Sequence, residues 1–240
     1  MKYVVLMTTY NRPHLLKQSL PQIEREAMSI GADLYIHDDQ SSNIETLAML
    51  AEAETRGVTV FRRPYVRQET NLTDHELTGM ANYYAFKYLI EEDKSWSHLI
   101  KVDDDTYWAN GAMRSMDTTF RQCLDDGVDV VLFSGISTTN EPELRDHGSY
   151  AITRGACHAA VIIDRQDLES FISKVPIPYI VNDGYDTCFM YRWVNIYRPD
   201  SEFVSIKPSV VYHTGMNGVH ISNLDVNRNF VGAVDDIVKG

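Results

Sequence analysis

The stretch Leu99-Ile100-Lys101-Val102-Asp103-Asp104-Asp105-Thr106 decides the fold that this sequence predicts. Its apolar start has the length and composition of a buried β-strand. The three carboxylates that follow repel one another unless a cation offsets their charge. Such hard oxygen ligands suit Mg²⁺ or Mn²⁺ held jointly with phosphate. A solvated acidic turn is the alternative interpretation of this motif when it stands alone.

On both sides of this stretch, apolar runs of strand length alternate with segments of helical period. The order is typical of an α/β protein with a mostly parallel central sheet flanked by helices. Because no repeat, low-complexity tract or linker interrupts it, we expect residues 1–240 to form a single domain. The expected strands are 2–8, 33–37, 58–62, 98–102, 129–134, 158–163, 203–206 and 209–212, and the expected helices are 13–28, 43–55, 73–91, 110–125 and 183–194.

Two other polar clusters follow expected strands, at Thr8–Pro13 and at His37–Asn43. Ligands of an open α/β sheet bind beyond the carboxyl ends of its strands, so we expect these clusters and the acidic triplet to meet in one crevice. A carboxylate such as Asp39 could accept hydrogen bonds from a nucleobase or a ribose. Helix capping by Ser42 or Asn43 and a turn role for Asp38 are the alternatives.

Composition excludes several classes of function. The formal charge of -12 disfavours broad binding to nucleic acid or anionic membrane. The sequence contains no G-x-G-x-x-G or G-K-[ST] motif, which argues against a dinucleotide dehydrogenase or a P-loop enzyme. The N-terminal apolar run is too short for a signal peptide or a membrane span. Because the scattered Cys123, Cys157 and Cys188 form neither a disulfide framework nor a zinc motif, we expect a cytoplasmic protein.

The segments Met7–Arg12, Asp38–Ser42 and Lys101–Thr106, in this order and spacing, resemble the signatures of GT-A fold glycosyltransferases, most closely glycosyltransferase family 2. The stretch from Asn71 to Phe86 also resembles the region before the acidic motif in that family. The resemblance is good over about residues 2–110 and loose beyond. It implies a single GT-A (Rossmann-like) domain, with a nucleotide-sugar-binding half over about 1–110 and an acceptor-binding and catalytic half over about 111–240.

The resemblance also implies roles for individual residues. Asp105 corresponds to the metal-binding aspartate, Asp103 to a carboxylate near the donor ribose or the metal, and Asp104 assists. A Mn²⁺ or Mg²⁺ ion would neutralise the leaving diphosphate. Around the nucleoside diphosphate sugar, the implied donor-binding residues are Thr8, Thr9, Tyr10, Asn11, Arg12, Asp39, Asp103 and Asp104.

The second half is expected to carry a catalytic base and a further metal ligand. Inverting members of the family have a Glu-Asp pair at a helix start, where one carboxylate takes the proton of the acceptor hydroxyl. This pair is absent from Asn182–Phe189, where Asp186 is the first candidate for the base and Asp183 the second. Capping of a helix by both is the alternative. His213 resembles a metal ligand found after an apolar run in many GT-A enzymes, with His220 as a weaker candidate.

The acceptor side has the weakest signals. Trp108 could stack on a sugar, and Arg154 could contact phosphate, although a surface salt bridge is the alternative for Arg154. The basic segment Phe61–Arg67 could meet a polyanionic acceptor or could be a solvated loop. The glycine-rich stretch Gly215–His220 suggests a loop that closes over the donor.

These features predict a metal-dependent glycosyltransferase that moves a sugar from a nucleoside diphosphate sugar to an acceptor hydroxyl. The acceptor could be a saccharide, a small molecule, a protein or a modified nucleic-acid base, since acceptor pockets come from variable loops. A nucleotidyltransferase and a non-catalytic nucleotide- or metal-binding module are the alternatives.

Overall fold

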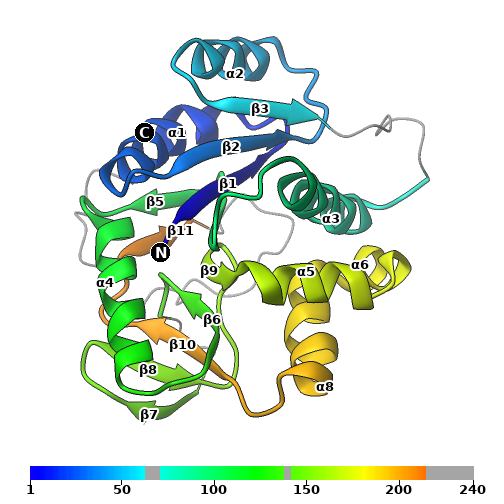
Figure 1. The fold of residues 1–240 in the computed structure, drawn as a ribbon. Helices are drawn as coiled ribbons and strands as arrows, with labels where there is room; N and C mark the ends of the chain where they lie inside the picture. The colour runs from blue at the N-terminus through cyan, green and yellow to red at the C-terminus, as the bar shows by residue number, and fades with distance from the viewer. Residues whose placement is uncertain (63–70, 138–141, 215–240) are drawn as a thin grey trace.

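The computed structural model describes residues 1–62, 71–137 and 142–214 (Figure 1). Its strands form a nine-stranded sheet in the order β3-β2-β1-β4-β9-β6-β10-β8-β7 and a small sheet of β11 and β5. The strands are β1 (Tyr3–Thr9), β2 (Asp33–Asp38), β3 (Thr59–Arg62), β4 (His98–Asp103), β5 (Thr106–Trp108), β6 (Val130–Ser134), β7 (Glu143–Asp146), β8 (Tyr150–Thr153), β9 (Ala160–Asp164), β10 (Glu202–Ile206) and β11 (Val211–His213).

The predicted α/β class is confirmed, and its parallel part is the amino-terminal half. Strands β3, β2, β1 and β4 run parallel. The second half is mixed, because β9 lies antiparallel between β4 and β6, and β8 pairs antiparallel with both β10 and β7. The strands β5, β7 and β8 were not among those expected from the sequence.

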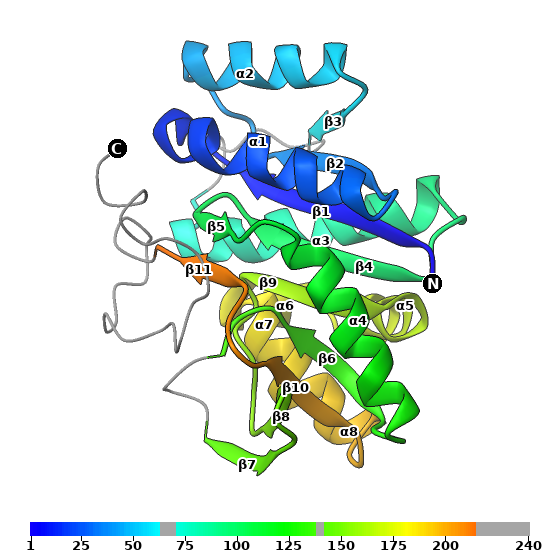
Figure 2. The same ribbon diagram turned by 90° about the vertical axis from the view of Figure 1, so that its left-hand side faces the viewer.

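Helices cover both faces of the sheet (Figures 1 and 2). On one face α1 contacts α2 and α4, and on the other α3 contacts α5 and α6. Each layer encloses its own apolar core, one containing Leu16 and Met116 and the other Phe86 and Phe171. The helices are α1 (Pro13–Ser29), α2 (Ile44–Thr55), α3 (Asp74–Glu92), α4 (Ala112–Asp125), α5 (Arg165–Lys174), α6 (Ile177–Asp183), α7 (Tyr185–Thr187), the π-helix η2 (Cys188–Val194) and α8 (Asn195–Tyr197).

Local signals account for the starts of several helices. Asn43 caps α2 as expected, since its Oδ1 accepts a hydrogen bond from Thr46 N at 3.0 Å. Thr73 and Glu76 form a capping box at the start of α3. The predicted helix over 183–194 is confirmed from Tyr185 onward, where α7, η2 and α8 follow one another without a gap, but its predicted start is wrong. Gly184, with φ of 82°, ends α6 there and starts a new turn, a backbone conformation that favours glycine.

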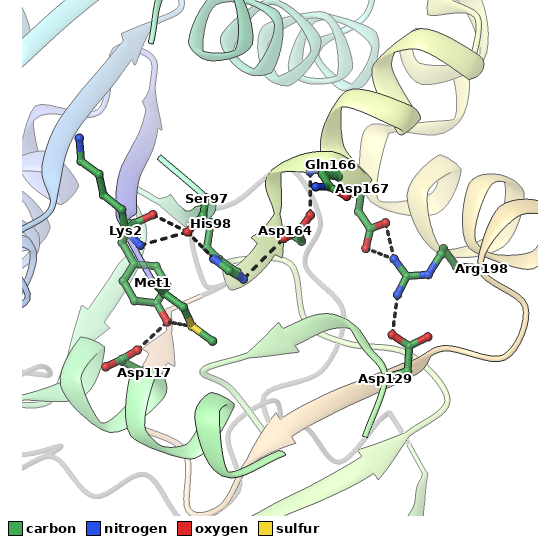
Figure 3. A network of polar contacts seen from close by, with 11 residues as sticks. Met1, Lys2, Ser97, His98, Asp117, Asp129, Asp164, Gln166, Asp167 and Arg198 are labelled. Carbon is green, nitrogen blue, oxygen red and sulfur yellow. Dashed lines mark hydrogen bonds and ion pairs between the residues drawn. The ribbon is translucent and has the colours of Figure 1, made fainter. Parts of the chain in front are cut away.

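Polar contacts tie together the amino-terminal edge of β4 and its neighbours (Figure 3). His98 Nε2 at the start of β4 lies 3.6 Å from an oxygen of Asp164, the residue that ends β9 and caps α5. Arg198 pairs with both Asp129 and Asp167. This edge is therefore occupied by internal ion pairs, and the carboxyl ends of the parallel strands lie at the opposite edge. No helix in the described ranges is long and apolar enough to cross a membrane.

Candidate active site

The carboxyl ends of β1, β2 and β4 bring the three polar clusters together. Thr9 lies opposite Asp38 in the β1–β2 register, and Thr8 lies opposite Asp103 in the β1–β4 register. Asp39 N, just beyond β2, donates a hydrogen bond to Thr9 O at 2.9 Å. The predicted convergence of the clusters at one edge of the sheet is confirmed.

Asn11 holds the first two clusters side by side. Its Oδ1 accepts hydrogen bonds from Ser42 N and Asn43 N, both at 2.8 Å, and its own N–H donates to Ser41 Oγ at 2.9 Å. Its φ of 50° lies in the left-handed region, which asparagine tolerates better than most residues. The side-chain oxygen of Asn11 therefore braces the loop.

Two adjacent aspartates end β2 and differ in their surroundings. Asp38 is fully buried, and its two oxygens accept hydrogen bonds from Ser41 N at 2.9 Å and from Arg62 Nε at 2.8 Å. The turn role that was the alternative for Asp38 is therefore what the structure shows. Asp39 is buried at the strand tip beside Thr9.

Each carboxylate of the acidic triplet (Asp103–Asp105) meets a basic side chain. Asp104 is buried and also accepts a hydrogen bond from Thr9 Oγ1 at 2.8 Å. The small sheet supplies one of the bases, because β11 pairs with β5 directly after the triplet. The basic partners are Lys101 for Asp103, Arg12 for Asp104 at 3.1 Å and for Asp105 at 3.4 Å, and His213 for Asp105 at 3.1 Å.

Burial and these partners set the charge of the triplet. Burial raises the pKa of Asp104 to about 7, although the nearby Arg12 opposes the shift. Burial also favours neutral Asp105, but the hydrogen bond and charge of His213 outweigh it and lower the pKa of that carboxyl. Burial disfavours charged His213, and Asp105 reverses this effect, so the pKa of His213 is raised. Asp105 and His213 therefore form an ion pair without a metal.

The residues at β4 and β11 fit a divalent cation that substrate phosphate helps to hold. Two ligands at right angles, each about 2.1 Å from a cation, lie about 3.0 Å apart. Asp105 Oδ1 and His213 Nε2 are 3.1 Å apart. Within residues 1–62, 71–137 and 142–214, no group of three or more His, Cys, Asp or Glu side chains is arranged as a metal site. Two protein ligands with phosphate and water is a common arrangement for Mg²⁺.

The predicted ligand Asp103 is engaged elsewhere. One of its oxygens binds the Lys101 ammonium, in a contact formed within β4. Alternation along a strand places residues 101 and 103 on the same face, which makes this pair possible. In this structure Asp103 is therefore positioned by Lys101, and Asp105 and His213 are the two side chains whose spacing would fit a cation.

The two candidate bases lie on either side of Gly184. Asp186 is half-buried in the first turn of α7, and Thr187 N donates a hydrogen bond to its Oδ1 at 2.8 Å. A Cβ added at Gly184 would lie 2.8 Å from Asp186 Oδ1 and 3.3 Å from His75 Cε1, so this carboxylate and this imidazole meet there. Asp183 instead ends α6 and pairs with Arg192. The alternative that Asp183 caps the following helix is wrong, because Gly184 is the N-cap residue of α7.

His158 is a buried neighbour of Asp186 that sequence reasoning missed. Its ring nitrogens are buried and have no hydrogen-bond partner among the residues that the structure describes. Burial lowers the pKa of His158 to about 4, although the charge of Asp186 opposes the shift. A lone histidine before an apolar strand carries no sequence signal of this position.

The structure does not bring the predicted acceptor residues to the crevice. Trp108 is 4% exposed, packs in the core and donates its indole N–H to Thr106 Oγ1 at 3.0 Å. Arg154 is exposed and follows β8, which runs antiparallel to β10, so it lies toward the edge away from the triplet. His220, the stretch Gly215–His220 and most of Phe61–Arg67 lie outside the described residues.

Helix α1 binds the segment after the triplet through Gln22 and Glu26, which lie one turn apart. The sequence did not single out either residue. Gln22 Oε1 accepts a hydrogen bond from Trp108 N at 2.8 Å. The carboxylate of Glu26, 1% exposed, accepts from Gly111 N at 3.0 Å and Met113 N at 3.2 Å. The only sequence signal is a pair of polar residues at i and i+4 on the buried face of a helix.

Comparison with known proteins shows the fold. No protein-family model matches this chain, and no curated protein matches its sequence. Residues 1–349 of S. aureus TarS align with a TM-score of 0.57 and 15% identity over 90% of this chain and 61% of that chain. The mannosyltransferase PcManGT from Pyrobaculum calidifontis, in complex with GDP-Man and Mn²⁺, aligns with a TM-score of 0.57 and 14% identity over 90% of this chain and 58% of that chain.

GalNAc-T7 with UDP, GalNAc and Mn²⁺ gives a TM-score of 0.60 and 13% identity, and the alignment covers 89% of this chain and 44% of that chain. The chain thus spans 44–61% of these three relatives. At these identities the likeness establishes the fold alone, and the fold is that of the GT-A glycosyltransferases.

Proposed function

We propose that this chain is a metal-dependent glycosyltransferase that moves a sugar from a nucleoside diphosphate sugar to an acceptor hydroxyl. The observation that carries the proposal is the meeting of Thr9, Asp39 and the acidic triplet at the carboxyl ends of three parallel strands, with His213 of a distant strand on Asp105. In an open α/β sheet this edge is where ligands bind. The GT-A fold, and relatives solved with UDP or GDP-Man and Mn²⁺, support the same assignment.

The donor is expected to lie across the tips of β1, β2 and β4. Asp39 accepts hydrogen bonds from the base, and Thr8, Thr9 and Tyr10 line the base and ribose. Arg12, whose side chain is 30% exposed, bridges Asp104 and Asp105 and can contact the diphosphate from the same position. Asp103 faces the ribose, held by Lys101.

Asp105 and His213 would hold Mn²⁺ or Mg²⁺ together with the diphosphate. When bound, the cation supplies Lewis-acid stabilisation of the leaving diphosphate. His213 would have to be neutral to act as a ligand, so a bound cation would take the place of the Asp105–His213 ion pair. In the structure, Arg12 contacts both Asp104 and Asp105.

We further propose that Asp186 is the base of an inverting reaction. Its half-buried carboxylate lies at the start of α7, next to the buried His158. Asp186 accepts the proton of the acceptor hydroxyl as that oxygen bonds to the anomeric carbon and the bond to the diphosphate breaks. Asp183 is excluded from this role because its carboxylate is paired with Arg192. The three free cysteines support a reducing, cytoplasmic location.

Thermal melting with a panel of UDP- and GDP-sugars, with and without Mn²⁺, tests the donor site. We expect the melting temperature to rise only with Mn²⁺ and one donor together, because a ligand of the native state stabilises it by mass action. Asp105→Asn should abolish the rise, whereas Asp146→Asn, an exposed aspartate, should keep it. No rise with any donor would refute the proposal.

Paired variants test the base. Asp186→Asn should keep donor affinity and lose transfer by roughly 10²–10⁴-fold, the usual contribution of a general base. Asp183→Asn, the matched control at the position directly before Gly184, should keep most activity. Equal losses in both variants, or full activity of Asp186→Asn, would contradict the assignment.

A further inference from the structure

Lys101 is a fully buried ammonium directly beneath the acidic triplet. It lies in the middle of the central strand β4, and its side chain is 2% exposed. Burying an ammonium is costly unless its charge is paired and its protons are hydrogen-bonded. A buried ion pair is often no more stable than apolar side chains of the same volume. Stability alone therefore does not account for a lysine at this position.

The contacts of Lys101 come from three segments of the chain. Its Nζ binds Asp103 Oδ1 and donates a hydrogen bond to His158 O at 3.2 Å. The same ammonium lies 5.0 Å from the ring centroid of Tyr185, whose hydroxyl also donates to His158 O at 3.2 Å. Lys101 thus joins the acidic triplet to the residue that precedes Asp186.

We propose that Lys101 is the built-in counter-cation of the acidic triplet. It fixes Asp103 when no divalent cation is bound and sets an upper limit on how tightly the site binds one. Asp104 and Asp105 share Arg12, and Asp105 also has His213. Among the described residues, Asp103 forms an ion pair only with Lys101. Without this ammonium, adjacent carboxylates in a buried site would repel one another. The part of the proposal that concerns metal rests on the proposed function.

The sign of the effect on metal affinity distinguishes this role from a merely structural one. A buried positive charge repels an incoming divalent cation, and the repulsion is weakly screened. Removing the charge while keeping the volume should therefore strengthen cation binding although it weakens the fold. A residue that only supports packing would give the opposite result, because a loosened site binds its ligand less tightly.

Mn²⁺ binding, measured alone and in the presence of UDP or GDP, tests the first consequence. Calorimetry should give a dissociation constant for Lys101→Met that is lower by at least about tenfold than that of the wild type, as expected from Coulomb repulsion. The control is Lys94→Met, which makes the same change of net charge at an exposed position before β4. It should leave the constant within about twofold, since exposed charges are screened by salt. Binding by Lys101→Met that is equal to or weaker than that of Lys94→Met would overturn the proposal.

A double-variant cycle in EDTA tests the second consequence without any metal. Lys101→Met should lower the melting temperature, and adding Asp103→Asn should recover most of the loss, because the carboxylate left without its cation is then neutral. Additive losses would overturn the proposal. If Lys101→Met alone does not fold, folding of the double variant supports the proposal and its failure to fold overturns it. If the wild type binds Mn²⁺ neither alone nor with UDP or GDP, the proposed metal site fails, and the cycle in EDTA alone decides the role of Lys101.

Discussion

Replacing Glu26 with alanine should destabilise this protein far more than its position in an ordinary helix suggests. The Glu26 carboxylate lies on α1 but accepts hydrogen bonds from Gly111 N and Met113 N, at the start of α4. Gly111 is the N-cap residue of α4 and has no side chain to cap it. The first amide groups of that helix therefore depend on a carboxylate from another helix.

The magnitude follows from these two contacts. A hydrogen bond to a charged group contributes about 1.5–3 kcal/mol, and a buried N–H left without a partner costs about as much. With some relaxation, Glu26→Ala should lose about 3–4 kcal/mol of unfolding free energy. For a chain of this size that corresponds to a fall of roughly 10 °C in melting temperature.

Glu24→Ala is the matched control, since it makes the same substitution in the same helix. Glu24 pairs with Arg56, whose side chain is 40% exposed, and such pairs contribute about 0–1 kcal/mol. Thermal melting and hydrogen exchange of both variants provide the assay. In Glu26→Ala the amides of Gly111 and Met113 should exchange faster. Equal melting temperatures in the two variants, or unchanged protection of these amides, would refute the reasoning.

Three further predictions concern stability. In Gly79→Ala the new methyl group would lie 2.4 Å from Ile180 O. The resulting overpacking should cost about 1–3 kcal/mol and outweigh the roughly 1 kcal/mol gain in helix propensity. An unchanged or higher melting temperature would contradict this prediction. Asn11→Ala removes the acceptor of two backbone N–H groups and should lower the unfolding free energy by about 2 kcal/mol. Urea denaturation measures this loss, and an unchanged midpoint would refute the prediction. The pKa of His158 is about 4 in the fold, below that of an unfolded histidine. Below about pH 6.5 the unfolded chain therefore binds a proton that the folded protein does not. The unfolding free energy is then unaffected by His158 above about pH 6.5 and falls by roughly 1.4 kcal/mol per pH unit toward pH 4. Urea denaturation across this range should show a shallower acid loss in His158→Gln, and parallel curves would count against the assignment.

The helices and strands of the first half could be predicted because their signals are local. The apolar runs before Thr8, Asp38 and Asp103 and the cap at Asn43 act over a few neighbouring residues, so the sequence is sufficient to place them. The convergence of the polar clusters also followed, because parallel strands present their carboxyl ends at one edge. The second half gave weaker predictions. Short antiparallel strands such as β8, which pairs with β10, depend on partners distant in sequence.

The sequence by itself determined the α/β class, the order of the elements from β1 to β4 and the acidic edge, because hydrophobic periodicity and capping are properties of contiguous residues. Tertiary structure alone decided which basic group meets which carboxylate. Lys101 could be read as an ordinary strand residue and Glu26 as a surface helix residue, and only the packing of β4, α1 and α4 buries both charges beside their partners. It also removed Trp108 from the crevice, since the register of β5 with β11 turns that side chain into the core. Burial and pairing of charge depend on contacts between distant segments, which the spacing of residues along the chain does not specify.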